Sequence, residues 1–244
     1  MSAIKTDKLR KEYKEVVAVQ GVDLEIEEGE LFALLGVNGA GKTTLIKMLT
    51  CLTAPTSGDA CVCGHSIVKD AAEVKKDIDV SMQETAIARK LTVEENIRFY
   101  AELNGQSKEE IERTKAMLYE AFGLDSVRGR QAAKLSGGWQ RKLSIALALV
   151  SSPKILFLDE PTLGLDVIAR RELWKTIRSF RGKMTVVLTT HYMEEAEALA
   201  DRIGVMKEGK LLFVGKKEEM FEKTGKTNVE DAFISIVSGG ELDA

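Results

Sequence analysis

The sequence predicts an α/β fold, in which strands and helices alternate along a chain of 244 residues. Short apolar runs at residues 31–35 and 155–158 are typical of fully buried strands, and residues 185–190, rich in β-branched side chains, predict another. Helical patterns follow at residues 43–52 and 167–180. The first run also leads directly into a glycine-rich loop, a connection typical of an open α/β sheet that binds a ligand.

The N-terminal region, residues 4–27, predicts a small antiparallel sheet. Apolar residues such as Val22, Leu24 and Ile26 alternate there with polar ones, as they do in half-buried strands. Tyr13 lies in this region. Its ring could stack on an adenine or pack against neighbouring side chains, and the residues themselves leave both interpretations open.

Cys61, Cys63 and His65 alternate along a further predicted strand, which would place all three side chains on one face. Such a face could hold a metal ion, but no second pair of ligands accompanies it. The default interpretation is that the cysteines are small, buried side chains. The chain contains three cysteines, and this odd number argues against a disulfide framework.

The loop after the first apolar run has the pattern Gly-x-x-x-x-Gly-Lys-Thr, completed by Gly36, Gly41, Lys42 and Thr43. Glycine lets successive backbone N–H groups converge on a phosphate, and a helix that begins near Lys42 adds its unpaired N-terminal donors. We expect Lys42 to reach the β- and γ-phosphates of a nucleotide and the Thr43 hydroxyl to coordinate Mg²⁺. The alternative is a glycine-rich turn that only connects a strand to a helix.

Polar side chains stand where three predicted strands end. Asp159 and Glu160 close a buried run, and we expect Asp159 to hold the metal and Glu160 to polarise a water for attack on phosphorus. His191 ends the next strand, where it could donate a hydrogen bond to a γ-phosphate. Gln83 ends the strand predicted at residues 78–82, where it could contact Mg²⁺ or the attacking water, or be an exposed loop residue.

From about residue 86, helical patterns replace strands. Thr92 and Glu95 form a capping box at the start of one predicted helix, and the helix at residues 108–122 stops at Gly123. Ser136 is predicted as an N-cap followed by two glycines, which makes a second helix end able to receive an anion. These features predict an all-helical insertion between the two halves of a nucleotide-binding fold.

Composition and charge narrow the classes of function. A formal net charge of −3 provides no broad attraction to nucleic acid. The longest apolar stretches, such as residues 143–150, fall short of the ~20 residues of a membrane-spanning helix. The N-terminus has no apolar segment typical of a signal sequence. We therefore expect a soluble, cytoplasmic chain.

In this order, the motifs resemble those of the nucleotide-binding subunit of ATP-binding cassette (ABC) transporters, and the resemblance covers nearly the whole chain. It implies a P-loop NTPase core of the RecA-like type with an N-terminal antiparallel β subdomain and an inserted α-helical subdomain. The core would comprise residues 1–85 and 153–225, and the helical signature subdomain residues 86–152. Residues 226–244 would form a short C-terminal tail.

The resemblance also implies roles for individual residues. Glu160, His191 and Gln83 would be catalytic, and Thr43, Gln83 and Asp159 would hold Mg²⁺. Trp139 stands where the family most often has glutamine, a change that leaves the neighbouring signature residues intact. The residues implied to bind ATP are Tyr13, Gly36, Asn38, Gly39, Ala40, Gly41, Lys42, Thr43, Thr44, Ser136, Gly137, Gly138 and Asp166.

The resemblance further implies partners. Two copies would associate head to tail, so that Ser136 and Gly138 of one close over the ATP held by the Gly36 loop of the other. A separate transmembrane permease would hold the pair on the inner face of the membrane. The segment Gln83-Glu84-Thr85 and the short tail resemble ABC-2 type exporters of drugs, sodium or polysaccharides. The alternative is a soluble ABC ATPase that acts on nucleic acid or ribosomes, which the negative charge and the single nucleotide core disfavour.

Overall fold

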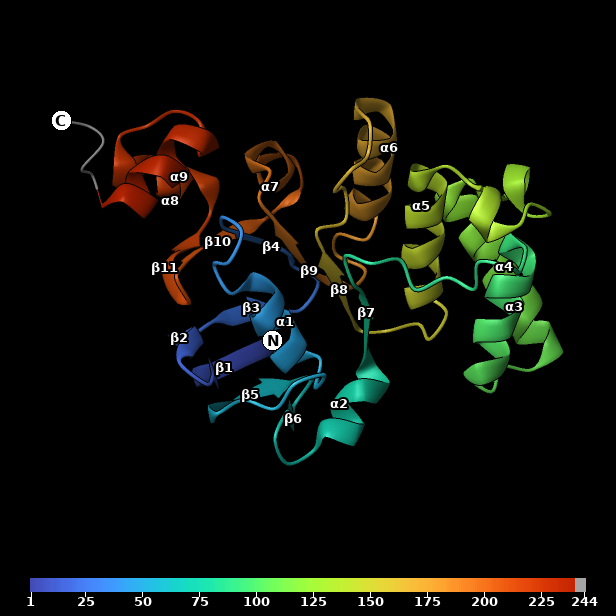
Figure 1. Cartoon of the computed structure of the whole chain (residues 1–244), viewed down its shortest axis with the longest axis horizontal. Coiled ribbons are helices and arrows are strands. Elements are labelled where there is room, and N and C mark those ends of the chain that lie inside the picture. Colours follow the sequence, from blue (N-terminus) through green and yellow to red (C-terminus); the bar gives the residue numbers. More distant parts are fainter. Residues whose placement is uncertain (240–244) are drawn as a thin grey trace.

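Strand β4 (Leu31–Leu35) separates two hydrophobic cores. All five of its residues are buried, and alternate side chains of a strand point to opposite faces of the sheet. Phe32 and Leu34 accordingly belong to one core, whereas Leu31, Ala33 and Leu35 belong to the other. The fold is layered about the sheet that contains β4 (Figure 1). The structure is a computed structural model that describes residues 1–239.

The sheet that contains β4 has six strands in the order β11-β10-β4-β9-β8-β7. The strands from β10 to β7 are parallel, and β11 is an antiparallel edge. Their bounds are β7 (Ile78–Ser81), β8 (Ile155–Asp159), β9 (Thr185–Thr190), β10 (Arg202–Lys207) and β11 (Lys210–Gly215). The buried strands predicted from apolar runs are thus confirmed. Because parallel strands end at one edge, the polar residues after β8 and β9 lie close together.

A second, antiparallel sheet contributes to the core that contains Phe32. It is built around β1 (Ser2–Tyr13), and it confirms the sheet predicted from residues 4–27. Its side chains pack with the buried face of helix α1 (Lys42–Leu49). The other strands are β2 (Val16–Val22), β3 (Glu25–Glu27), β5 (Ser57–Val62) and β6 (His65–Ser66).

The interpretation of Cys61, Cys63 and His65 as one strand face is wrong. The chain turns through Cys63, whose φ is 49°, and His65 begins β6, where it pairs back with Val62 of β5. Cys61 is exposed, so it is not the buried side chain that we expected, and Cys63 is half-buried. Within residues 1–239, no group of three or more His, Cys, Asp or Glu side chains is arranged to hold a metal ion.

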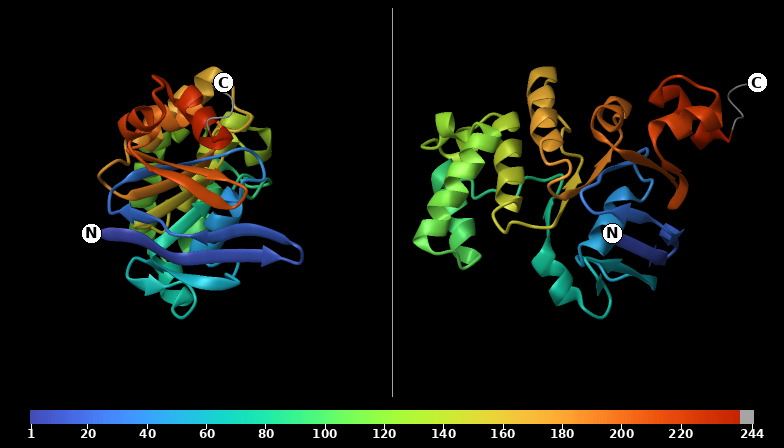
Figure 2. Two further views of the ribbon diagram at one scale, coloured as in Figure 1. Left: turned by 90° about the vertical axis from the view of Figure 1, so that its left-hand side faces the viewer. Right: turned by 180° about the vertical axis from the view of Figure 1, so that it is seen from behind.

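The helical insertion lies at one end of the molecule (Figures 1 and 2). It contains α3 (Val93–Leu103), α4 (Lys108–Phe122) and α5 (Gly137–Ala148), with two short 3₁₀ turns, η1 (Leu124–Val127) and η2 (Ala132–Lys134). The predicted Thr92 capping box is present, and Gly123 ends α4 in a left-handed conformation at φ 67°. Ser136 is the N-cap of α5, as its position before two glycines predicts.

Three helices of the structure are not among those predicted from the sequence: α2 (Ala71–Asp77), α7 (Met193–Leu199) and α8 (Lys217–Thr224). A further helix, α9 (Val229–Ser238), lies in the predicted C-terminal segment. The helix predicted after residue 166 is present as α6 (Val167–Arg178). We expected residues 226–244 to form a short C-terminal tail. Within this segment, helix α9 buries Val229, Ala232 and Phe233 in the core, and residues 240–244 lie outside the described part. Helices α8 and α9 lie at the end of the molecule opposite the helical insertion (Figure 2).

Across residues 1–239, no helix combines the length and the apolar character needed to cross a bilayer.

Leu118 of α4 tests how much the insertion depends on its own core. The side chain is 0% exposed, whereas that of the adjacent Met117 is 43% exposed. We predict that Leu118→Ala lowers the free energy of unfolding by about 2–5 kcal/mol, because it leaves a cavity. The control Met117→Ala should change it by no more than about 0.5 kcal/mol. Urea unfolding followed by tryptophan fluorescence measures both values, and equal losses would contradict the packing described here.

Candidate functional site

The loop between β4 and α1 folds closely against backbone, and only glycine fits at two of its positions. A Cβ atom on Gly36 would lie 2.5 Å from the Met206 carbonyl oxygen, and one on Gly41 would lie 2.3 Å from the Ala18 carbonyl oxygen. Gly41 also has φ 103° and is the N-cap of α1, and glycine has no side chain to cap the helix. The first backbone N–H groups of α1 therefore remain available to an anion.

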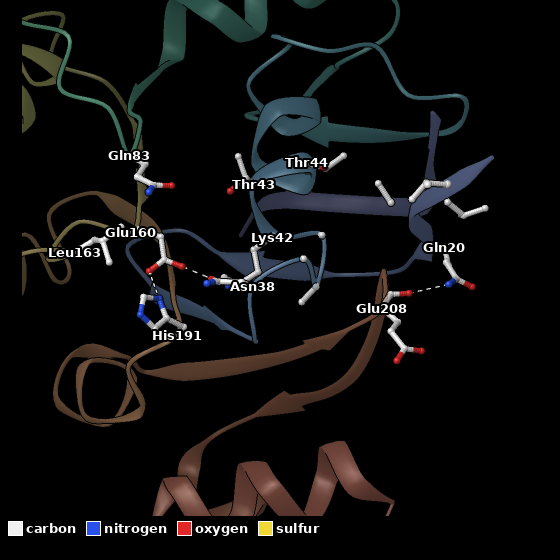
Figure 3. A pocket seen from close by; sticks show the side chains of 16 residues that line it. Gln20, Asn38, Lys42, Thr43, Thr44, Gln83, Glu160, Leu163, His191 and Glu208 are labelled. Carbon is white, nitrogen blue, oxygen red and sulfur yellow. Dashed lines mark hydrogen bonds and ion pairs between the residues drawn. The ribbon is translucent and has the colours of Figure 1, made fainter. Parts of the chain in front are cut away.

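Lys42 lies in this loop beside a carboxylate from the neighbouring part of the sheet. Its Nζ atom donates to the Gly36 carbonyl at 2.6 Å and lies 3.3 Å from Glu160 Oε1. Both charged side chains are nearly buried, at 6% and 8% exposed. The other oxygen of Glu160, Oε2, lies 2.7 Å from His191 Nδ1 (Figure 3). Glu160 thus joins the phosphate loop to the residue that follows β9.

The backbone of Glu160 has a strained conformation. Its φ is 50°, in the left-handed region that non-glycine residues seldom adopt. Its N–H bonds to Thr189 of β9, at 3.2 Å from the carbonyl oxygen and 3.1 Å from the hydroxyl. Such a conformation persists only where surrounding contacts hold it, and it is commonest at functional sites.

Asp159 lies directly behind Glu160 and is 1% exposed. Its Oδ1 atom accepts hydrogen bonds from Thr43 Oγ1 at 3.1 Å and from Thr189 Oγ1 at 2.5 Å. Its Oδ2 atom is buried and has no hydrogen-bond partner within residues 1–239. A buried carboxylate oxygen without a partner is costly unless it meets a donor or a cation. Carboxylate and hydroxyl oxygens are the ligands that Mg²⁺ prefers, so Asp159 and Thr43 fit such an ion.

A cleft of about 630 Å³ opens in front of these residues. Gln83, Glu160 and His191 follow one another along one side, and Lys42 and Thr43 face them (Figure 3). The predicted site residues that line the cleft are Asn38, Gly39, Ala40, Gly41, Lys42, Thr43, Thr44, Gln83, Glu160 and His191. The structure therefore gathers residues from four separate motifs around one space large enough for a nucleotide.

Part of the cleft wall was missed by sequence reasoning. Val16, Val17 and Ala18 of β2 line it, as does Glu208 in the turn between β10 and β11. This turn is fixed by backbone hydrogen bonds, because Gly209 N–H donates to the Ala40 carbonyl and its own carbonyl accepts from Gln20 N–H. These residues form no recognisable motif, and the packing of the two sheets against each other brings them to the site.

Tyr13 does not line this cleft. It ends β1 next to the β1–β2 turn, its side chain is 45% exposed, and the Lys11 ammonium lies 5.0 Å from the centre of its ring. Its role in stacking on adenine stays a prediction. Val16, which pairs with Tyr13 across the turn, does face the cleft.

The Ser136 turn also lies outside the cleft of its own chain. Ser136 and Gly137 are exposed, and the Ser136 side chain makes no capping hydrogen bond to α5. The first turn of α5 carries no acidic residue, as is also true of α1. In contrast, the N-cap side chains of α3 and α4 do bond to their helices. The N-terminus of α5 is therefore uncapped, and the cleft of its own chain does not use it.

Asp166 and Gly138 lie where α5 and α6 approach each other. Asp166 is the N-cap of α6, and its Oδ1 atom accepts from the backbone N–H groups of Ile168 and Ala169 at 2.9 Å each. A Cβ atom on Gly138 would lie 3.1 Å from Ala169 Cβ, so glycine allows this close packing. Neither Asp166 nor Gly138 lines the cleft, and a contact from Asp166 to ATP stays a prediction.

A phosphate cradle backed by a lysine, beside two adjacent acids at the end of β8, is the arrangement of P-loop ATPases. Comparison with known proteins makes the class specific. The chain belongs to the ABC transporter family, whose sequence model matches residues 19–163. It is an ATP-binding domain of the ATPase type, which agrees with the resemblance found in the sequence, and the predicted P-loop NTPase fold is confirmed.

The chain covers most of the length of one curated relative but only a small part of another. It is 36% identical over 244 residues to the daunorubicin resistance ATP-binding protein DrrA3 of Streptomyces coeruleorubidus, which covers 100% of this chain and 76% of that protein. It is 42% identical over 213 residues to the human phospholipid-transporting ATPase ABCA3, which covers 87% of this chain. The chain spans only 12% of the length of ABCA3.

A solved structure shows the same fold. The dimeric structure of an ATP-binding cassette in a post-hydrolysis state, bound to ADP and Pi, matches with a TM-score of 0.79 at 27% identity. The match covers 87% of this chain and 98% of that one.

Lys42 tests the assignment of the cradle. We predict that Lys42→Ala weakens ATP binding by roughly 10- to 100-fold, the range expected when a charge-assisted hydrogen bond is lost. Lys47→Ala is the matched control, because Lys47 lies on the same helix but does not line the cleft. Titration with a fluorescent ATP analogue measures both affinities, and unchanged affinity in Lys42→Ala would refute the assignment.

Proposed function

We propose that this chain hydrolyses ATP in the cleft between the phosphate loop and the ends of β8 and β9, and that Glu160 is the general base. The position of Glu160 carries the proposal: its carboxylate lies between Lys42 and His191 at the cleft wall. A carboxylate there can accept the proton of an attacking water while Lys42 binds phosphate oxygens. His191 orients Glu160 and can donate to a γ-phosphate, and Gln83 lies close enough to the same side to order the water.

The cofactor of this reaction is proposed to be Mg²⁺. Thr43 and Asp159 would hold it, with Gln83 as a further ligand from the cleft wall. The ion would neutralise charge on the phosphates. The chain's own contribution is to orient Asp159 through the hydrogen bond from Thr189.

The complete site is proposed to form between two copies of the chain. Ser136 and Gly138 lie outside the cleft of their own chain, yet they present an uncapped helix N-terminus suited to a phosphate. A head-to-tail pair would bring this turn over the nucleotide bound by the other copy. The dimeric structure of a related cassette supports this arrangement. Exposed apolar side chains at Leu163, Val167 and Ile168, near the same edge, would be covered in the pair.

The pair is proposed to drive a transporter of the exporter type from the inner face of a membrane. The similarity to a drug-resistance ATP-binding protein over the whole chain supports this proposal. A separate permease would supply the membrane span. Residues 1–85 and 153–225 would act as the core, residues 86–152 as the signature subdomain, and residues 226–244 as the C-terminal segment. Action on nucleic acid is disfavoured by the net charge of −3.

Replacement of Glu160 separates binding from hydrolysis. Glu160→Gln keeps the size of the side chain but removes its ability to accept a proton, so phosphate release should fall by roughly 10²- to 10⁴-fold. ATP affinity should be kept or increased, because Lys42 and the glycine cradle are unchanged and Lys42 no longer pairs with a charged carboxylate. Phosphate release and ATP titration measure the two effects, and light scattering should detect an ATP-bound pair. Normal turnover would exclude Glu160 as the base.

Replacement of Ser136 tests the shared site. Ser136→Arg should leave ATP binding to the single chain intact but lower hydrolysis by roughly a hundredfold, because the larger side chain displaces the helix N-terminus from the γ-phosphate of the one site that it contacts. Ser126→Arg makes the same change at another exposed position of the helical insertion and should keep wild-type activity. Equal activity of the two variants would show that the Ser136 turn takes no part in catalysis.

A further inference from the structure

Arg141 is a buried cation outside the cleft, and none of the roles described above uses it. It lies one turn into α5, five residues after Ser136, and is 4% exposed. Burial lowers the pKa of its guanidinium to about 10, so the group remains charged at neutral pH. Asp159, Glu195 and Glu160 stabilise that charge through space. Its hydrogen bonds go to backbone carbonyls instead of to these carboxylates.

Two of these bonds hold the backbone on either side of Glu160. Nη2 donates to the Asp159 carbonyl at 2.8 Å, and Nε donates to the Pro161 carbonyl at 2.9 Å. Glu160 itself has the strained φ of 50°. A rigid, planar guanidinium that binds both flanking carbonyls fixes the direction in which the Glu160 side chain leaves the backbone.

The third donor reaches the segment that carries Gln83. Nη1 donates to the Met82 carbonyl at 2.5 Å and to the Gln83 carbonyl at 3.2 Å. One side chain of α5 therefore bonds to the backbone of Gln83 and to the backbone on both sides of Glu160, two of the residues that line the same wall of the cleft. Any shift of the first turn of α5 relative to the sheet must strain or break these bonds.

Stability alone is a weak reason for such a residue. A buried charge carries a desolvation cost, and replacing it with an apolar side chain is often neutral or stabilising. A lysine could supply the charge but not a flat array of donors in three directions. The arrangement therefore points to a geometric role at the reacting end of the sheet.

We propose that Arg141 is a positioning residue that couples the Ser136 end of α5 to Glu160 and Gln83. Engagement of the Ser136 turn by the nucleotide of a second copy would then set the position of the general base and of the water-ordering amide. The inference rests on the proposed hydrolysis of ATP at Glu160. It adds that the base is held in place from the helix that contacts the other copy.

The test compares Arg141→Gln and Arg141→Lys with Lys142→Gln in the full chain. Lys142 is the matched control, because it is the next buried cation on α5, but it bonds to Glu172 of α6 and touches neither Glu160 nor Gln83. We expect kcat for ATP to fall at least tenfold in both Arg141 variants, with KM changed less than twofold. Lys142→Gln should retain kcat within twofold.

Three outcomes overturn the proposal. If Arg141→Lys restores wild-type kcat, charge and not geometry matters. If kcat per folded molecule is unchanged in Arg141→Gln while the melting temperature falls, the residue is only structural. If KM rises in parallel with the loss of kcat, Arg141 acts on nucleotide binding. Wild-type hydrolysis and its loss in Glu160→Gln are measured alongside, so a failure of the proposed function itself is recognised separately.

Discussion

The buried ion pair between Lys42 and Glu160 is the contact on which the site depends. It joins the first residue of α1 to the residue that follows β8, across a distance of 3.3 Å. The pair exists because the central strands run parallel, so that the loop after β4 and the ends of β8 and β9 meet at one edge of the sheet. A phosphate in the cradle would compete with Glu160 for Lys42. Nucleotide binding would thereby release the carboxylate for reaction, since the same lysine cannot neutralise both fully.

The residues behind this pair explain why its geometry is kept. Thr189 of β9 bonds both to Asp159 Oδ1 and to the Glu160 N–H group, so one hydroxyl orients both adjacent acids. Arg141 donates to the carbonyl between them. This edge of the sheet is therefore supported by the N-terminal part of α5, where Ser136 would meet a second copy in the proposed pair. Catalysis and association are joined through one short helix in this account.

The sequence alone predicted those parts of the fold in which local chemistry decides the structure. The phosphate loop, the capping box at Thr92 and the left-handed end of α4 at Gly123 each depend on residues close together in the chain. The turn at Cys63 was missed because an alternating pattern does not reveal where a hairpin reverses. The second wall of the cleft, at Val16 and Glu208, could not be predicted either, because it depends on how two sheets pack together.

Tyr13 shows a different limit of sequence reasoning. A motif position indicates that an aromatic residue lies near the nucleotide, but its exposed ring beside Lys11 does not line the cleft. For Ser136, in contrast, the sequence and the structure agree on a helix N-terminus at this residue, and the structure adds that Ser136 does not line the cleft of its own chain. This separation is the reason for proposing that a second copy completes the site.

Complementation between two inactive chains tests this central claim most directly. Glu160→Gln and Ser136→Arg are purified separately, mixed without nucleotide, and assayed for phosphate release after ATP is added. In a head-to-tail heterodimer, one site contains both defects and the other contains neither. The account predicts that the equimolar mixture recovers about a quarter of wild-type activity, because half of randomly formed pairs are mixed and each has one intact site. A mixture as inactive as its components would contradict the account.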